Sequence, residues 1–131
     1  MIGEGRGRFA RGEGFLPAPY VRVGVGFGKD RVAAASALVD SGADVCLFPA
    51  ELLPWALSGL SSTEMVLTPA EYETYPVTVY YPSLTVGTIR MEGVACAVLP
   101  GADPLLGRSF LNECEVLLSA REDVVRLRRK T

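Results

Sequence analysis

Hydrophobic and polar residues alternate along the chain from residue 21 to residue 27. Every odd-numbered position there is apolar, whereas the even-numbered positions hold Arg22 and two glycines. This period of two predicts a β-strand with one buried face. A turn follows over residues 28–30, and residues 31–39 become wholly apolar toward their end. A continuous apolar run of this kind predicts a second strand that enters the core.

Short apolar segments alternate with turn residues through the rest of the chain. Short helical turns are predicted at residues 49–53, where a proline falls in the first turn, and at residues 108–113. So many short strands at close spacing indicate an all-β fold. Strands are predicted at residues 65–67, 77–81, 84–86, 89–91 and 94–99, with a closing hairpin at residues 115–118 and 124–128.

The first 16 residues differ from the others because they combine glycines and alternating charges without hydrophobic periodicity. We therefore expect residues 1–16 to form a flexible Gly/Arg-rich arm and residues 17–131 to form one domain. A length of 131 residues, 49% of them hydrophobic, suits a single folded domain with its own core.

The chain contains no histidine. This count excludes a Ser-His-Asp triad, a Cys-His dyad and a histidine-ligated zinc site within the chain. Acid–base chemistry near neutral pH usually falls to imidazole, so here it must come from carboxylates, a perturbed Lys or Cys, or a partner.

Other features of the composition narrow the expected partners. Cys46, Cys96 and Cys114 are widely spaced, form no CxxC pair and suggest reduced thiols rather than a metal site or a disulfide framework. The glycine-rich residues 24–29 lack the spacing of a phosphate loop, so no nucleotide cofactor is expected. A net charge of −2 gives no reason to expect nucleic acid, and the longest apolar run, residues 32–39, is too short to span a membrane. Without a secretory leader pattern, the expected location is the cytoplasm.

A carboxylate follows the second predicted strand directly, at Asp40-Ser41-Gly42. A carboxylate at the end of a core strand is held rigidly and is partly desolvated, while the serine hydroxyl can lock the turn and the glycine permits close backbone approach. One such carboxylate is a poor catalyst. Two of them brought together share a proton and can serve as base and acid at once. The simpler reading of Asp40 is a turn carboxylate that caps backbone donors.

Residues 37–44, Ala-Leu-Val-Asp-Ser-Gly-Ala-Asp, resemble the active-site signature of retroviral-type (retropepsin-like) aspartic proteases. Residues 105–108, Leu-Leu-Gly-Arg, resemble the second signature of that family, and they are followed by a stretch that permits a short helix. The resemblance covers about residues 17–120, with an outer hairpin before the aspartate and a β-rich region between the two motifs.

The resemblance implies a single-lobe acid-protease fold: an all-β closed barrel with one or two short helices, active as a homodimer. Because the chain carries one Asp-Ser-Gly motif, the two aspartates would be Asp40 from each subunit, with the active site on the twofold axis. A water held between them would attack the peptide bond of a polypeptide substrate. This mechanism needs no metal, no cofactor and no histidine.

The resemblance also implies a role for each matching residue. Asp40, Ser41 and Gly42 would form the catalytic loop, and Gly107 and Arg108 would support it. An ion pair between Asp44 and Arg108 would brace the dimer near the site, although the same pair would equally suit simple bracing of the fold. Substrate contacts are expected at Leu38, Ala43, Asp44, Leu105, Leu106 and Tyr72, although the leucines are also typical core residues.

The region between the motifs departs from the viral pattern, in which the flap that closes over substrate has a glycine-rich tip. Residues 61–81 contain no glycine, and residues 68–72 are the candidate tip, with Tyr72 placed to close over substrate. The principal hypothesis is an aspartic endopeptidase that cuts between apolar side chains at acid to mildly acid pH. The alternative is a catalytically weak, dimeric peptide-binding or scaffold module on the same fold.

Overall fold

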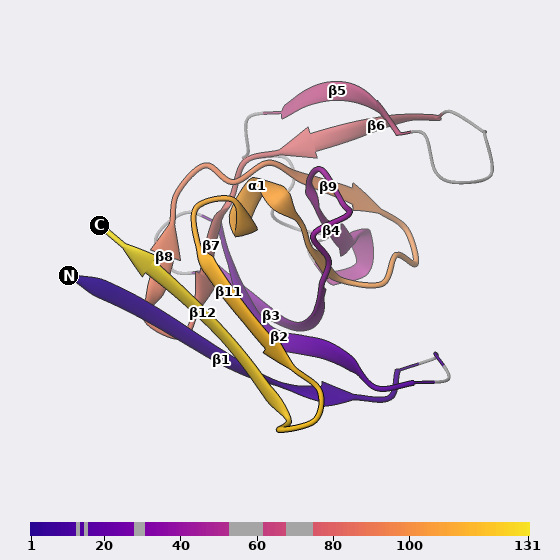
Figure 1. The fold of residues 1–131 in the computed structure, drawn as a ribbon. Coiled ribbons are helices and arrows are strands. Elements are labelled where there is room, and N and C mark those ends of the chain that lie inside the picture. Colours follow the sequence, from indigo (N-terminus) through magenta and orange to yellow (C-terminus); the bar gives the residue numbers. More distant parts are fainter. Residues whose placement is uncertain (13, 15, 28–30, 53–61, 68–74) are drawn as a thin grey trace.

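The structure is a computed structural model, and it describes residues 1–12, 14, 16–27, 31–52, 62–67 and 75–131. Within these residues most of the chain is β-strand, as the spacing of apolar segments predicts (Figure 1). The strands are β1 (Ile2–Ala10), β2 (Ala18–Phe27), β3 (Arg31–Val39), β4 (Cys46–Pro49), β5 (Ser62–Leu67), β6 (Tyr75–Tyr80), β7 (Ser83–Val86), β8 (Ile89–Met91), β9 (Cys96–Leu99), β10 (Leu105–Leu106), β11 (Glu115–Ser119) and β12 (Val124–Lys130).

The described strands join in one sheet, ordered β11-β12-β1-β2-β3-β10-β4-β9-β6-β5. Strand β7 pairs with β2 and carries β8 on its other side. The sheet does not close into a barrel, so the expectation of a closed barrel is wrong. Closure would require its two end strands to pair, but β11 lies on the lower part of the molecule in Figure 1 while β5 and β6 form a hairpin at the top.

The first two predicted strands form the β2–β3 hairpin, with a register that runs from Tyr20 opposite Leu38 to Phe27 opposite Arg31. The apolar odd-numbered residues of β2, Val21, Val23 and Val25, are buried. The period-two pattern therefore predicted both the strand and the face that it turns to the core.

The glycine-rich start of the chain does not form the expected flexible arm, because residues 2–10 form strand β1. This strand pairs with β12 from Ile2 opposite Lys130 onward and with β2 from Gly7 opposite Val21 onward. A Cβ atom on Gly7 would lie 1.9 Å from the Tyr20 carbonyl oxygen. Glycine here therefore allows close strand packing, whereas in sequence it indicated flexibility.

Strand β10 lies between β3 and β4 and connects the two halves of the sheet. It runs parallel to β3, with Leu105 opposite Leu38, and antiparallel to β4, with Leu105 opposite Leu47. Because β10 comes almost seventy residues after β3 in sequence, only the tertiary fold makes these strands neighbours.

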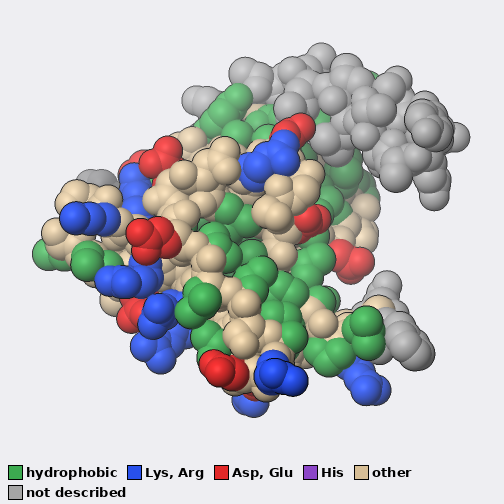
Figure 2. Space-filling model, in the orientation of Figure 1, with side chains coloured by type: hydrophobic (Ala, Val, Ile, Leu, Met, Phe, Trp, Pro, Cys, Tyr) green, Lys and Arg blue, Asp and Glu red, His purple; other side chains and the backbone are tan. Residues whose placement is uncertain are grey.

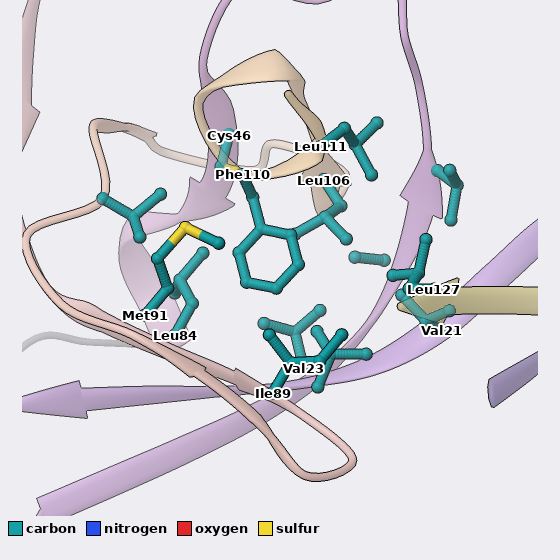
Figure 3. Close-up of a cluster of buried hydrophobic side chains, with 14 of the residues drawn as sticks. Val21, Val23, Cys46, Leu84, Ile89, Met91, Leu106, Phe110, Leu111 and Leu127 are labelled. Atoms are coloured by element: carbon teal, nitrogen blue, oxygen red, sulfur yellow. The ribbon is translucent and has the colours of Figure 1, made fainter. Parts of the chain in front are cut away.

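The main core lies beneath β10 and is enclosed by β2, β7, β8 and β12. Phe110 is fully buried and its ring occupies the middle of this cluster (Figure 3). It comes from the short helix α1 (Arg108–Leu111), which follows β10 directly. A smaller cluster on the other side of β4 and β9 contains Val77, Val79 and Ala97.

The two predicted helical turns correspond to α1 and to the 3-10 helix η1 (Ala50–Leu52). Neither of these helices approaches the length and apolar content required to cross a membrane. The candidate flap tip at residues 68–72 lies outside the described residues.

Candidate active site

Asp40 lies immediately after β3, at the point where the chain leaves the core. Its carboxylate oxygen Oδ1 accepts a hydrogen bond from the Gly42 N–H at 2.9 Å, and its carbonyl oxygen accepts one from the Ala43 N–H at 3.3 Å. The Asp40 N–H in turn donates to the Leu106 carbonyl at 3.0 Å. The backbone of the second motif thus fixes the position of the aspartate, and the turn after it orients the carboxylate.

Gly107 allows the two motifs to pack closely together. A Cβ atom at this position would lie 2.3 Å from the Val45 carbonyl oxygen and 2.9 Å from the Ala43 carbonyl oxygen. Any side chain here would push the second motif away from the Asp40 loop, so this position requires glycine.

Arg108 holds the Asp40 loop from the other motif through its side chain and its backbone. Its guanidinium group donates to the Ser41 carbonyl at 3.0 Å and forms an ion pair with Asp44. Its N–H donates to the Ala43 carbonyl at 2.8 Å. The Asp44 side chain is 77% exposed, so the ion pair itself adds at most about 1 kcal/mol to stability. Its main effect is to fix the geometry of the loop.

Beneath the loop, Ser109 of α1 connects two segments that are far apart in sequence, the start of β4 and the residue before β9. Its hydroxyl group donates to the Ala95 carbonyl at 2.8 Å and accepts a hydrogen bond from the Cys46 N–H at 3.1 Å. The Cys46 thiol lies against the second motif as well, because it accepts the Gly107 N–H at 3.4 Å. The lower side of the site is therefore a closed hydrogen-bond network.

Cys46 and Cys96 lie opposite each other on the parallel strands β4 and β9, and both are buried. A hydrogen bond from Cys96 lowers the pKa of the Cys46 thiol to about 7, with smaller contributions from Ser109 and Gly107. Burial raises the pKa of the Cys96 thiol well above its ordinary value. All three cysteines are free, as their spacing in sequence indicates.

The side of the site that faces away from the main core is called its upper side. There, four side chains from four different strands form one row. Tyr20 lies opposite Leu38, Leu38 lies opposite Leu105, and Leu105 lies opposite Leu47. Residues directly opposite each other in a sheet project from the same face. Leu38 also precedes Asp40 by two residues, and residues two apart along a strand lie on the same side. The row is therefore on the same side of β3 as Asp40.

This row borders a cavity of about 640 Å³, to which Leu38, Leu47 and Leu105 all contribute. Leu38 and Leu105 were among the expected substrate contacts, whereas sequence analysis missed Leu47, Tyr20 and Ser109. Tyr20 is one of the even-numbered residues outside the apolar pattern of β2, so its position carried a weak signal. Leu47 and Ser109 gave none, because their roles depend on long-range pairing.

One of the expected substrate contacts, Leu106, is not on this surface. The Leu106 side chain is fully buried in the main core, so it supports the site from below and is not accessible to a substrate. Tyr72 lies outside the described residues. Ala43 and Asp44 are in the loop beside Asp40, half-buried and exposed respectively. No group of three or more acidic or cysteine side chains suited to a metal ion occurs in the described ranges.

A family model described as an aspartyl protease matches residues 21–110, which include both motifs and the strands between them. The chain belongs to this aspartyl protease family. Its recognition as a retropepsin-like member is confirmed by this match together with the fold. A comparison with curated proteins gave no match.

The fold of this aspartyl protease family member is similar to the crystal structure of a retropepsin-like aspartic protease from Rickettsia conorii. The TM-score is 0.62 at 20% sequence identity, and the match covers 98% of this chain and 93% of the other. At this level of identity the similarity concerns the fold alone.

Proposed function

We propose that this chain is an aspartic endopeptidase that works as a homodimer and hydrolyses peptide bonds in a polypeptide substrate. The observation that carries the proposal is the Asp40 loop, in which a carboxylate at a strand end is held in place by hydrogen bonds from a second, distant motif. Membership of the aspartyl protease family supports the same reaction.

The proposed chemistry uses two Asp40 carboxylates, one from each subunit, with a water molecule between them. One carboxylate takes a proton as the water attacks the peptide carbonyl, and the other donates a proton to the carbonyl oxygen. Within the described part of the chain, only Oδ1 of the Asp40 carboxylate accepts a hydrogen bond, from Gly42. The second carboxylate oxygen is left for the water or the partner aspartate.

The other loop residues have proposed roles that follow from their positions. Ser41 would join the hydrogen-bond network beneath the aspartate pair, and Gly42 and Ala43 would contact the substrate backbone. Asp44, already paired with Arg108, would contact substrate at the edge of the site. Tyr72 remains the proposed contact from the flap.

An exposed apolar surface beside the loop supports the proposed dimer. Strand β11 is an end strand of the sheet, and its Val116, Leu117 and Leu118 side chains are 40–47% exposed. Val116 and Leu118 also line a cavity of about 400 Å³ together with Ser41 and Arg108. Hydrophobic side chains gather in the middle of the face drawn in Figure 2, the face on which Figure 1 places β11 and α1.

A second copy pairing along β11 would cover this surface and satisfy the free edge of the strand. It would also approach the catalytic loop, since the cavity joins β11 to Ser41, the neighbour of Asp40. The dimer and the shared active site would then depend on the same surface.

The test is a mixing experiment with peptide cleavage measured by mass spectrometry across pH 3–7. Asp40→Asn alone is expected to lose activity by a factor of about 10²–10⁴, the usual contribution of an acid–base group. Added to the wild type in threefold excess, with time for subunits to exchange, it should reduce the remaining activity to about a quarter, because mixed dimers have only one aspartate.

Matched variants separate the two parts of the proposal. The exposed and distant Glu122→Gln should leave cleavage unchanged. Asp40→Asn combined with Leu118→Lys should fail to inhibit the wild type, since a charge on β11 blocks pairing. Unchanged cleavage in Asp40→Asn would refute the mechanism. A wild type that dimerises and binds peptides without cleaving them would instead be the dimeric peptide-binding module.

A further inference from the structure

The cavity on the upper side of the site combines an apolar floor with a single charged residue. Leu38, Leu47 and Leu105 form the floor, and Asp103 lies at the side, next to Pro104. The Pro104 carbonyl accepts the Leu38 N–H at 3.0 Å, which holds the residues around Asp103 against β3, the strand that precedes Asp40. Asp103 is the only charged side chain among the described residues that line the cavity.

No cation neutralises Asp103 within the described parts of the chain. Its side chain is exposed and takes part in no hydrogen bond or ion pair there. Two arginines that flank the site are engaged elsewhere, since Arg108 pairs with Asp44 and Arg8 pairs with Asp123. Arg22 lies two residues from Tyr20 on β2 but does not line the cavity. The carboxylate is therefore free to receive a positive charge from a ligand.

Tyr20 adds an aromatic surface to the same cavity. It lies next to Leu38 in the row of side chains across the sheet, and its hydroxyl group lies against Gly12. Among described residues the hydroxyl makes no hydrogen bond. An aromatic ring attracts a cation placed over its face, and long basic side chains lay their methylene stems along apolar surfaces. Leucines, an aromatic ring and one carboxylate together suit a lysine or arginine side chain.

We propose that this cavity binds a basic side chain of the peptide substrate beside the cleaved bond, with Asp103 as the residue that determines specificity. This inference rests on the proposed peptidase function and names its substrate class. The leucine floor holds the methylene stem, and the ammonium or guanidinium group reaches Asp103 and the ring of Tyr20. In a twofold dimer the cavity occurs once on each side of the aspartate pair, so a basic residue is preferred on either side of the bond.

The experiment compares two peptides that differ only in one residue beside the cleaved bond, either lysine or norleucine. Norleucine keeps the aliphatic stem without the charge, so their ratio of kcat/KM isolates the charge. Wild-type protein should prefer lysine, and Asp103→Asn should lower the lysine-to-norleucine ratio about fivefold, as expected for loss of a partly exposed ion pair. Asp103→Lys should reverse the preference in favour of a glutamate peptide.

A binding measurement keeps this test independent of catalysis. The same peptides are titrated calorimetrically into Asp40→Asn protein with and without Asp103→Asn, and the affinity ratio should change by a similar factor. The wild type could also bind the lysine peptide selectively, in a way that requires Asp103, without ever cleaving it. That result would support the proposed specificity of the cavity and refute the proposed peptidase activity. A ratio that is unaffected by Asp103→Asn, or no binding of either peptide, would overturn the proposed specificity. Glu122→Gln is the matched control and should leave both ratios unchanged.

Discussion

The two faces of the sheet at β3 and β10 differ sharply, although their residues alternate along the same short strands. Ala37, Val39 and Leu106 point into the core and are buried. Leu38 and Leu105 project from the other face and remain half-buried beside a cavity. One face therefore determines stability, and the other is left free for recognition.

This division follows from the geometry of a strand, because successive side chains point to opposite sides. A catalytic carboxylate placed directly after such a strand is supported by a packed core on one side and reached by ligands on the other. Substitutions on the two faces should accordingly affect different properties, and neighbouring residues should give contrasting results.

The largest contrast is expected between Leu106→Ala and Leu105→Ala. Leu106 is fully buried in the main core, so its truncation should reduce the free energy of unfolding by about 2–5 kcal/mol. Leu105 borders the open cavity, and its truncation should cost about 1 kcal/mol while altering peptide binding. Urea unfolding at one protein concentration, together with peptide titration, measures both. Equal losses of stability would show that the two faces do not differ as described.

A smaller effect is expected from Ser109→Ala, which acts on the packed side of the site without changing the open side. The Ala95 carbonyl would lose its hydroxyl donor, and the Cys46 N–H would keep only its 3.3 Å hydrogen bond to Ala95. The expected destabilisation is about 1–3 kcal/mol. Urea unfolding measures it, and Ser109→Thr, which keeps the hydroxyl group, is the control. A stability equal to the wild type would mean that this network is not maintained in solution.

The smallest effect is expected at Asp123, an exposed residue whose side chain joins the turn before β12 to β1. Its carboxylate accepts the Phe9 N–H at 2.7 Å and pairs with Arg8, and these contacts lower its pKa below the ordinary 3.8. Because this pKa is lowered in the folded state, the ionised carboxylate stabilises the fold above about pH 4. This stabilisation is lost as the pH falls through the pKa that Asp123 has in the folded protein.

Asp123→Asn should therefore be slightly less stable than the wild type at neutral pH, and the difference should shrink below pH 4. Thermal unfolding of both proteins from pH 2 to pH 7 measures this change. Glu122→Gln in the same turn is the control, since its carboxylate makes no such contacts in the described structure. A difference that stays constant with pH would show that the carboxylate is not held by Phe9 and Arg8.

Local patterns in the sequence were sufficient to predict the strands whose alternation is regular, such as β2. They were also sufficient to recognise the two motifs that identify the family. They failed at β1, because the Gly7 that allows close packing against β2 is also typical of a flexible arm. They also failed at Leu106, since an apolar residue in a motif can equally face a ligand or the core. The absence of closure in the sheet had no local signal, because it depends on where distant end strands lie.

The sequence by itself determined the family, the single aspartate of the Asp-Ser-Gly motif and the absence of histidine from the chemistry. Tertiary structure alone decided which leucine is buried, how Arg108 and Ser109 hold the loop, and that Tyr20, Asp103 and Leu47 share one cavity. The physical reason is that motif residues are neighbours along the chain. The cavity and the supporting network instead join strands whose pairing spans tens of residues, and no local pattern encodes that pairing.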